Sequence, residues 1–270
     1  MPLIEANHTR LWVERHGHPA RPPVLLLHGL FFSGQMYDRL LPALTTRFHC
    51  VTIDGRSMGR SARALGGHDV DNLCADMMAV QDALQLGPAH WVGSSVGGVI
   101  GLRVAAQWPE RVLSLVTCGA SAHAEPLDKL NRYESLLASY ASDPASAWPR
   151  LAPVLYGPDF LNNPARAADR HVQFQAFIDN DGPSIQRAAA PILRRVGIEH
   201  MLAHVRCPTL AIVGEHDGAN PPEHSRHIVA GIDGARLHVM PGVGHQPNAE
   251  APVQLGHTIA AFLQAAPMVS

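Results

Sequence analysis

The chain has 270 residues, of which 46% are hydrophobic and 16% are charged, a composition that favours a packed globular protein. Its 21 lysine and arginine residues nearly balance 23 aspartate and glutamate residues. The sequence therefore has no basic surface that would indicate a nucleic-acid partner and no acidic tail that would indicate disorder. No apolar run is long enough to predict a membrane span or a secretory leader. We expect a cytoplasmic monomer or small homo-oligomer whose partner is a small molecule.

The four cysteines predict buried thiols rather than a disulfide framework. None has Cys-x-x-Cys spacing, and three of them, Cys50, Cys118 and Cys207, lie in or beside apolar strand-like runs. This usage is typical of a reducing compartment.

Short apolar runs bounded by turn residues predict buried parallel strands. These runs span residues 23–27, 49–53, 90–92, 112–117, 209–213 and 236–240. Helix-length stretches at 37–46, 70–86 and 99–107 lie between them. Strands that alternate with helices predict an α/β protein with helices on both faces of a parallel sheet. Residues 3–5 and 10–14 predict an antiparallel hairpin at the sheet edge.

The strand pattern stops between about residues 120 and 201, where three amphipathic pieces at 128–140, 165–178 and 184–196 predict a helical insertion. We expect a core of residues 1–120 and 201–270 and a helical cap of residues 121–200. Aromatic residues at helical spacing usually pack in a core, and any remainder would line a pocket. The aromatics of the insertion are Tyr133, Tyr140, Trp148, Tyr156, Phe160, Phe174 and Phe177.

The segment Gly93-Ser94-Ser95-Val96-Gly97 follows one apolar run and begins a helix-like run. In the pattern Gly-x-Ser-x-Gly the serine occupies a sharp turn between strand and helix, and the glycines leave room for neighbouring backbone. Only Ser95 has glycine two residues to each side, so we predict Ser95 rather than Ser94 as the nucleophile. The N–H of Val96, at a helix N-terminus, is a candidate oxyanion donor.

A serine hydroxyl needs a general base, and that base needs an acid to orient it. Asp217 and His245 each follow a predicted strand, at the carboxyl ends of the strands, where open α/β proteins bind ligands. Glu215 is a rival acid, but it belongs to the strand end, whereas Asp217 begins the loop. The other usual place for an acid, after residues 112–117, offers no carboxylate in Cys118-Gly-Ala-Ser121. We therefore predict Asp217 as the acid and His245 as the base.

A second oxyanion donor is predicted at the N–H of Leu30, because His28-Gly29-Leu30 also follows a strand. Metal and cofactor sites are not expected. The spaced histidine pairs, such as His200 with His204, lie outside any His-Glu-x-x-His frame and beside no cysteine pair. No glycine-rich nucleotide loop is present either.

Together these segments resemble the α/β-hydrolase superfamily almost end to end. Four of them match its four loops in chain order: His28-Gly29, the strand-to-helix turn around Ser95, Gly214-Glu-His-Asp217 and Gly244-His245. The resemblance implies a mostly parallel eight-stranded sheet, helices on both faces and a helical cap insertion. The cap, Tyr156-Gly-Pro-Asp-Phe-Leu161 and Cys207-Pro-Thr-Leu-Ala-Ile212 look most like the 3-oxoadipate enol-lactonases and related esterases.

One loop departs from the resemblance. Many relatives have Asp-x-Arg-Gly-x-Gly-x-Ser where this chain has Asp54-Gly-Arg-Ser-Met-Gly-Arg-Ser61. Because this loop borders the pocket in relatives, the change bears on the substrate more than on the chemistry. From composition and resemblance we predict a modest, largely apolar substrate. Its predicted binding residues are Phe31, Met58, Trp148, Tyr156 and Phe160.

The leading hypothesis is a cofactor-independent serine hydrolase of carboxylic esters or lactones. A second is hydrolysis of a carbon–carbon bond in a vinylogous diketone, which relatives perform with the same triad. Such sites usually need basic residues for substrate carboxylates, and the sequence offers Arg103, Arg150, Arg166, Arg170, Arg194 and Arg195. A third is a ligand-binding protein without catalysis on the same scaffold.

Overall fold

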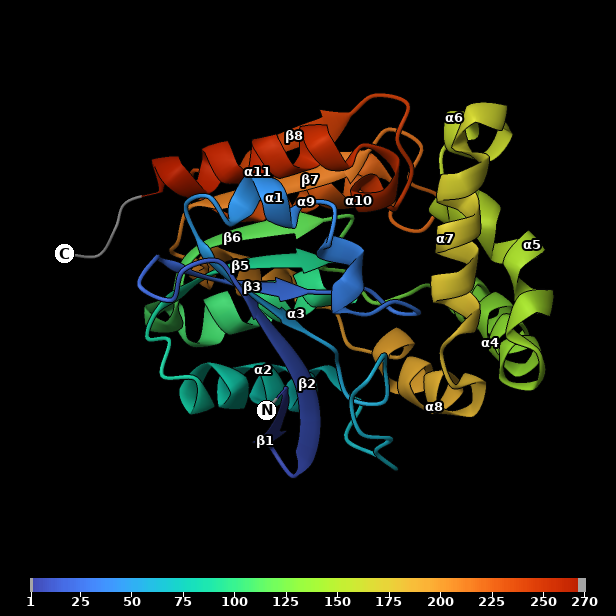
Figure 1. Ribbon diagram of the computed structural model, residues 1–270, viewed down its shortest axis with the longest axis horizontal. Helices are drawn as coiled ribbons and strands as arrows, with labels where there is room; N and C mark the ends of the chain where they lie inside the picture. The colour runs from blue at the N-terminus through green and yellow to red at the C-terminus, as the bar shows by residue number, and fades with distance from the viewer. Residues whose placement is uncertain (1, 267–270) are drawn as a thin grey trace.

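A computed structural model describes residues 2–266 and contains one mixed sheet of eight strands (Figure 1). Their order across the sheet is β1-β2-β4-β3-β5-β6-β7-β8. The pairs β1–β2 and β2–β4 are antiparallel and all the others are parallel, which confirms the predicted fold class and edge hairpin. The strands are β1 (Leu3–Ala6), β2 (Thr9–His16), β3 (Pro23–Leu27), β4 (His49–Ile53), β5 (Ala89–Ser94), β6 (Val112–Cys118), β7 (Thr209–Gly214) and β8 (Arg236–Met240).

The inner strands are mostly apolar and almost entirely buried, because helices cover both of their faces. Successive side chains of a strand point to opposite faces. Leu25 and Leu27 of β3 accordingly pack in one hydrophobic cluster, while Val24 and Leu26 pack in the other. Figure 1 shows α1 and α11 over one face and α2 and α3 over the other. The helices of this part are α1 (Leu41–Leu44), α2 (Val70–Ala83), α3 (Val96–Gln107), α9 (Pro222–Gly231), α10 (Pro247–Glu250) and α11 (Pro252–Ala265).

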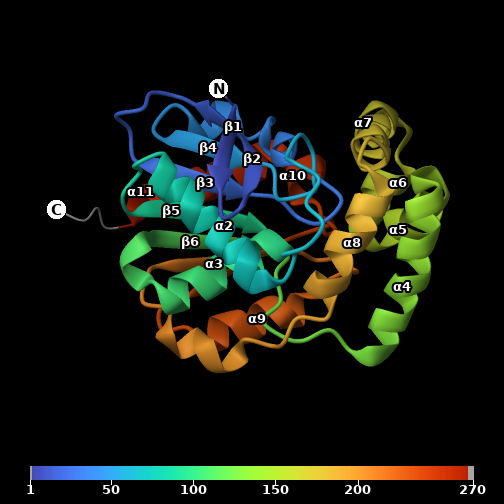
Figure 2. The ribbon, with the colours of Figure 1, turned by 90° about the horizontal axis from the view of Figure 1, so that it is seen from below.

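Five more helices lie together beyond the carboxyl ends of the strands, toward which the arrowheads point (Figures 1 and 2). We call this group the helical layer. The pairs α4–α8, α4–α5 and α5–α7 are in contact. The helical layer consists of α4 (Leu127–Ser142), α5 (Pro144–Leu155), α6 (Pro158–Asn162), α7 (Ala167–Ile178) and α8 (Gly182–Leu193).

Proline explains two of the differences between the observed and the predicted helices. The helix predicted over 37–46 is two short pieces, a 3-10 turn at Gly34–Tyr37 and then α1, in which Pro42 lies in the first turn. Helix α5 was not predicted, because it contains Pro149 and Pro153. Proline usually breaks a helix interior.

All four cysteines are buried and free, as predicted. Within residues 2–266, none of the helices combines the length and the hydrophobicity needed to cross a membrane.

Candidate active site

Ser95 occupies the turn between β5 and α3 in a backbone conformation that few side-chain-bearing residues adopt. Its φ is 52° and its ψ is −114°, and such strain is typical of functional sites. A Cβ on Gly93 would lie 2.2 Å from the carbonyl oxygen of Gly97, and one on Gly97 would lie 2.3 Å from that of Leu27. Both positions therefore require glycine. Ser94 belongs to β5, and its Oγ is buried without a hydrogen-bond partner.

Asp217 and His245 meet at the ends of β7 and β8. The Nδ1 of His245 lies 2.9 and 2.8 Å from Oδ1 and Oδ2 of Asp217. Asp217 Oδ1 also accepts the N–H groups of Ala219 and Asn220, at 3.0 and 2.7 Å. Because a carboxylate only accepts, Nδ1 of His245 carries the proton and Nε2 is left with a lone pair. The rival acid, Glu215, accepts the Gly242 N–H at 2.9 Å and is exposed.

Gly119, at the end of β6, makes room for this pair. Its φ is +58°, and a Cβ there would lie 2.7 Å from Asp217 Oδ2 and 2.9 Å from His245 Nδ1. Its carbonyl accepts the Asn220 side-chain amide at 2.7 Å. The end of β6 therefore offers space to the pair instead of a carboxylate of its own.

Two backbone N–H groups beside Ser95 are free to bind an oxygen. In the described part of the chain, the N–H groups of Leu30 and Val96 have no protein acceptor. His28 anchors the loop that carries Leu30, because its Nε2 accepts the Gly55 N–H at 2.7 Å and its Nδ1 donates to the Gly29 carbonyl at 2.7 Å. These two bonds require a neutral ring, and burial lowers the pKa of His28 accordingly.

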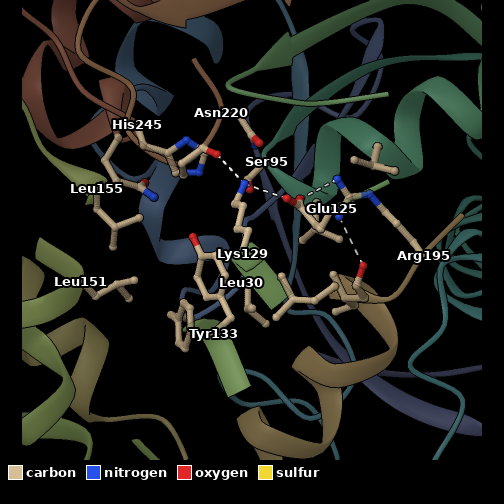
Figure 3. A pocket seen from close by; sticks show the side chains of 17 residues that line it. Leu30, Ser95, Glu125, Lys129, Tyr133, Leu151, Leu155, Arg195, Asn220 and His245 are labelled. Atoms are coloured by element: carbon tan, nitrogen blue, oxygen red, sulfur yellow. Dashed lines mark hydrogen bonds and ion pairs between the residues drawn. The ribbon is translucent and has the colours of Figure 1, made fainter. Parts of the chain in front are cut away.

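Ser95 and His245 line one cavity of about 70 Å³ between the strand ends and the helical layer (Figure 3). Leu30, Phe31 and Val96 line it from the strand side. The helical side contributes apolar side chains, but also three charged ones that the sequence prediction did not place there. The residues of that side include Glu125, Lys129, Tyr133, Leu151, Leu155, Ile192, Leu193 and Arg195.

The predicted substrate-binding residues are dispersed in the structure. Phe31 lines the cavity, whereas Met58 lines a separate space of about 20 Å³ next to α2. Trp148, Tyr156 and Phe160 pack among themselves in the helical layer and are not among the residues that line the cavity. A role of any of these five residues in substrate binding stays a prediction.

The histidine pairs do not assemble a metal centre in the described residues, where no group of three or more His, Cys, Asp and Glu side chains is placed to hold an ion.

Comparison with known proteins defines the class of the chain. Residues 22–143 match the family described as alpha/beta hydrolase fold. A relative from Caulobacter sp. (strain K31), named carbamate hydrolase RutD, is 32% identical over 94% of this chain and 95% of its own. Rhodomycin D methylesterase DauP from Streptomyces sp. (strain C5) is 30% identical over 92% and 95%. The chain therefore belongs to the α/β-hydrolase family.

Among solved structures, the enol-lactonase from Burkholderia xenovorans LB400 is similar to this chain with a TM-score of 0.91. It is 21% identical, and the match covers 97% of this chain and all of that one, so it bears on the fold alone. Structural neighbours of the kind that the sequence resemblance predicted are thus present. The family and the two named relatives support a hydrolase that acts on a small molecule.

Proposed function

We propose that the chain is a serine hydrolase of carboxylic esters, with Ser95 as nucleophile, His245 as general base and Asp217 as its orienting acid. The observation that carries the proposal is the Asp217–His245 hydrogen bond beside a strained serine in a shared cavity. The name of the methylesterase relative supports an ester substrate.

In the proposed reaction, Ser95 Oγ attacks the ester carbonyl while His245 Nε2 takes its proton. The N–H groups of Leu30 and Val96 bind the oxyanion that forms. His245 then returns the proton to the departing alcohol, which leaves an acyl-serine. A water molecule, deprotonated by His245, attacks the acyl-serine and releases the acid and free Ser95.

We further propose that the helical layer, within the predicted range 121–200, acts as the cap of the site. Its support is that α4, α5 and α8 supply side chains to the cavity opposite Ser95. Such a cover excludes water and strengthens electrostatic interactions near the reacting groups.

The test is a panel of short-chain esters, lactones and carbamate esters, measured on the wild type and on Ser95→Ala. We expect Ser95→Ala to lose at least about 10⁴-fold in kcat at unchanged thermal stability. Ser94→Ala is the matched control and should keep most of the activity, because Ser94 is not among the residues that line the cavity and its hydroxyl has no hydrogen-bond partner. Ester turnover that survives Ser95→Ala would exclude the proposed nucleophile.

Carbon–carbon bond hydrolysis is a second candidate, because Lys129 and Arg195 bring basic groups into the cavity. A ring-cleavage dienoate that is turned over, with no turnover of any ester, would favour it. Tight ligand binding without product would instead favour a binding protein, although such a protein has no need of the Asp217–His245 bond.

A further inference from the structure

Three charged side chains lie together in the cavity that contains Ser95. Glu125 precedes α4, Lys129 is in the first turn of α4, and Arg195 follows α8. Glu125 Oε2 pairs with Lys129 Nζ at 2.7 Å, and its Oε1 pairs with Arg195 Nη2 at 2.8 Å. Figure 3 shows Glu125 between the two basic side chains. The side chains of Glu125, Lys129 and Arg195 are only 7%, 16% and 7% exposed. We call them the buried charge cluster.

The cluster carries an excess positive charge. Burial opposes ionisation of Glu125, but Arg195 and Lys129 outweigh it and hold the pKa of Glu125 below its usual value. Glu125 is therefore an anion at neutral pH, and one carboxylate faces two cations. A buried charge is costly unless it is paired, so the unmatched positive charge favours an anionic ligand.

The cations also keep unused hydrogen-bond donors. Both oxygens of Glu125 are engaged, whereas Lys129 Nζ bonds only Glu125 and the Ala219 carbonyl, at 2.7 Å. An ammonium has three donors, which leaves one for a ligand. Arg195 donates from Nη2 to Glu125 and the His123 carbonyl and from Nη1 to the Ile192 carbonyl. Two of its five N–H groups remain, because a guanidinium has five donors.

A second cavity, of about 450 Å³, adjoins the first and is also basic. The two share Lys129, Tyr133, Leu151 and Ala219. The second cavity adds Arg132 and Arg150, and no aspartate or glutamate lines it. Arg132 pairs at 3.0 Å with Asp128, which lies outside this lining. A cavity lined by charges of one sign attracts ligands of the opposite sign.

Lys129 is also the only lysine in the sequence, since the other 20 of the 21 basic residues are arginines. An ammonium is a compact charge whose donors point in three separate directions, unlike the planar fork of arginine. That geometry lets Lys129 hold Ala219 and Glu125 and still offer a donor to the cavity.

We propose that Lys129 and Arg195 bind a free carboxylate of the substrate, so that the enzyme hydrolyses small esters that are themselves acids. The inference rests on the proposed function and deepens it. A cavity of about 10 to 15 Å³ is enough for one water molecule. The first cavity, of about 70 Å³, therefore holds a group of only a few heavy atoms. A short chain therefore separates the carboxylate from the ester carbonyl at Ser95.

The experiment compares kcat/KM for ester pairs that differ in one charge. In the first pair, monomethyl succinate has a carboxylate on the acyl side, and methyl succinamate has a neutral amide in its place. In the second pair, acetoxyacetate has the carboxylate on the alcohol side, and acetoxyacetamide has a neutral amide in its place. We expect the wild type to prefer the anion of at least one pair by about tenfold to 100-fold, the range of a charge-assisted hydrogen bond. The preferred pair tells on which side the carboxylate lies.

Arg195→Met should abolish the preference, because the anionic ester loses a charge-assisted hydrogen bond that the neutral amide does not make and is therefore slowed more. Lys129→Arg keeps the charge but loses the ammonium geometry, and should keep a smaller preference than the wild type. Arg194→Met is the matched control and should match the wild type, because Arg194 is exposed and pairs with Glu134 outside the cavity.

Binding provides a readout that does not depend on catalysis or on an Arg195 variant that folds. Calorimetry on Ser95→Ala should detect succinate and find succinamate at least about tenfold weaker. Equal rates for both members of each pair, together with no succinate binding, would overturn the inference even if Ser95-dependent ester hydrolysis is intact. Loss of the proposed function would instead appear as no Ser95-dependent turnover of any ester, charged or neutral.

Discussion

The two sides of the cavity are built differently. On the strand side, Ser95, Asp217 and His245 lie in short loops whose backbones are tightly confined, as the close contacts at Gly97 and Gly119 show. On the helical side, the lining consists of side chains from separate helices, and its polar part is the buried charge cluster. Under the proposed function, the strand side carries out the chemistry and the helical side selects the substrate.

Glu250 joins the two sides. Its carboxylate accepts the N–H of Gly244, which precedes His245, at 3.0 Å and the N–H of Gly157, which precedes α6, at 2.8 Å. The N–H of His245 also donates to Leu155 of α5, at 2.9 Å. The position of His245 thus depends on both sides of the cavity. Substitutions on each side show what that side contributes to the rate and to the stability.

The largest effect is expected on the strand side, at Asp217. Asp217→Asn should lower kcat by about 10³ to 10⁴-fold, because an amide that donates to Nδ1 favours the wrong histidine tautomer. Steady-state kinetics at constant thermal stability is the measurement. Glu215→Gln is the matched control, since Glu215 is exposed and contacts Gly242. An Asp217→Asn variant that is no slower than Glu215→Gln would remove Asp217 from the mechanism.

A smaller effect, on stability rather than rate, is expected for Phe160 in the helical layer. Phe160 is 1% exposed and stacks on Tyr156 at a ring distance of 4.6 Å. Phe160→Ala should lower the free energy of unfolding by about 3 to 5 kcal/mol, measured by urea denaturation. The exposed Val172→Ala of α7 should cost little. A large increase in KM with unchanged stability would instead support Phe160 as a substrate-binding residue.

The smallest effect concerns pH and Glu250. Burial raises the pKa of Glu250 from 4.5 to about 7, although the N–H groups of Gly244 and Gly157 and the charge of Arg166 oppose the shift. The folded state then binds a proton that the unfolded state has lost, so stability from this group is full below pH 4.5 and is lost as the pH rises through 7.

Glu250→Gln should remove this dependence. Relative to the variant, we expect the wild type to lose up to about 3 kcal/mol of unfolding free energy between pH 4.5 and pH 8. Urea denaturation of both proteins at the two pH values gives the difference. A difference that stays constant, or that grows in favour of the wild type as pH rises, would show that Glu250 is ionised throughout this range.

The layout of the strand side can be expected from the sequence for a physical reason. Each of its residues lies within five residues of a strand end, so the loops around Ser95, Asp217 and His245 are recognisable from local spacing, and parallel topology brings these loops together. The parallel strands, the edge hairpin and the buried thiols were predicted for the same reason, because the local sequence pattern determines periodicity and burial.

The helical side was harder because its contacts join residues that are distant in sequence. Glu125 and Arg195 are 70 residues apart, and the packing of α4 against α8 brings the segments next to these helices together. The sequence offers six candidate arginines without indicating which one points into the cavity, and the local spacing does not mark Glu125 or Lys129. One signal was available, since a sole lysine among 20 arginines is an unusual choice. The aromatics gave no such signal, because a buried ring looks the same in a core and in a pocket.

The most direct test of the proposed chemistry is covalent labelling with a fluorophosphonate, followed by intact-mass measurement and peptide mapping. We predict one adduct per chain, on Ser95, in the wild type and in Ser94→Ala, and none in Ser95→Ala. An adduct on another residue, or one that persists in Ser95→Ala, would contradict the assignment of Ser95 as the nucleophile.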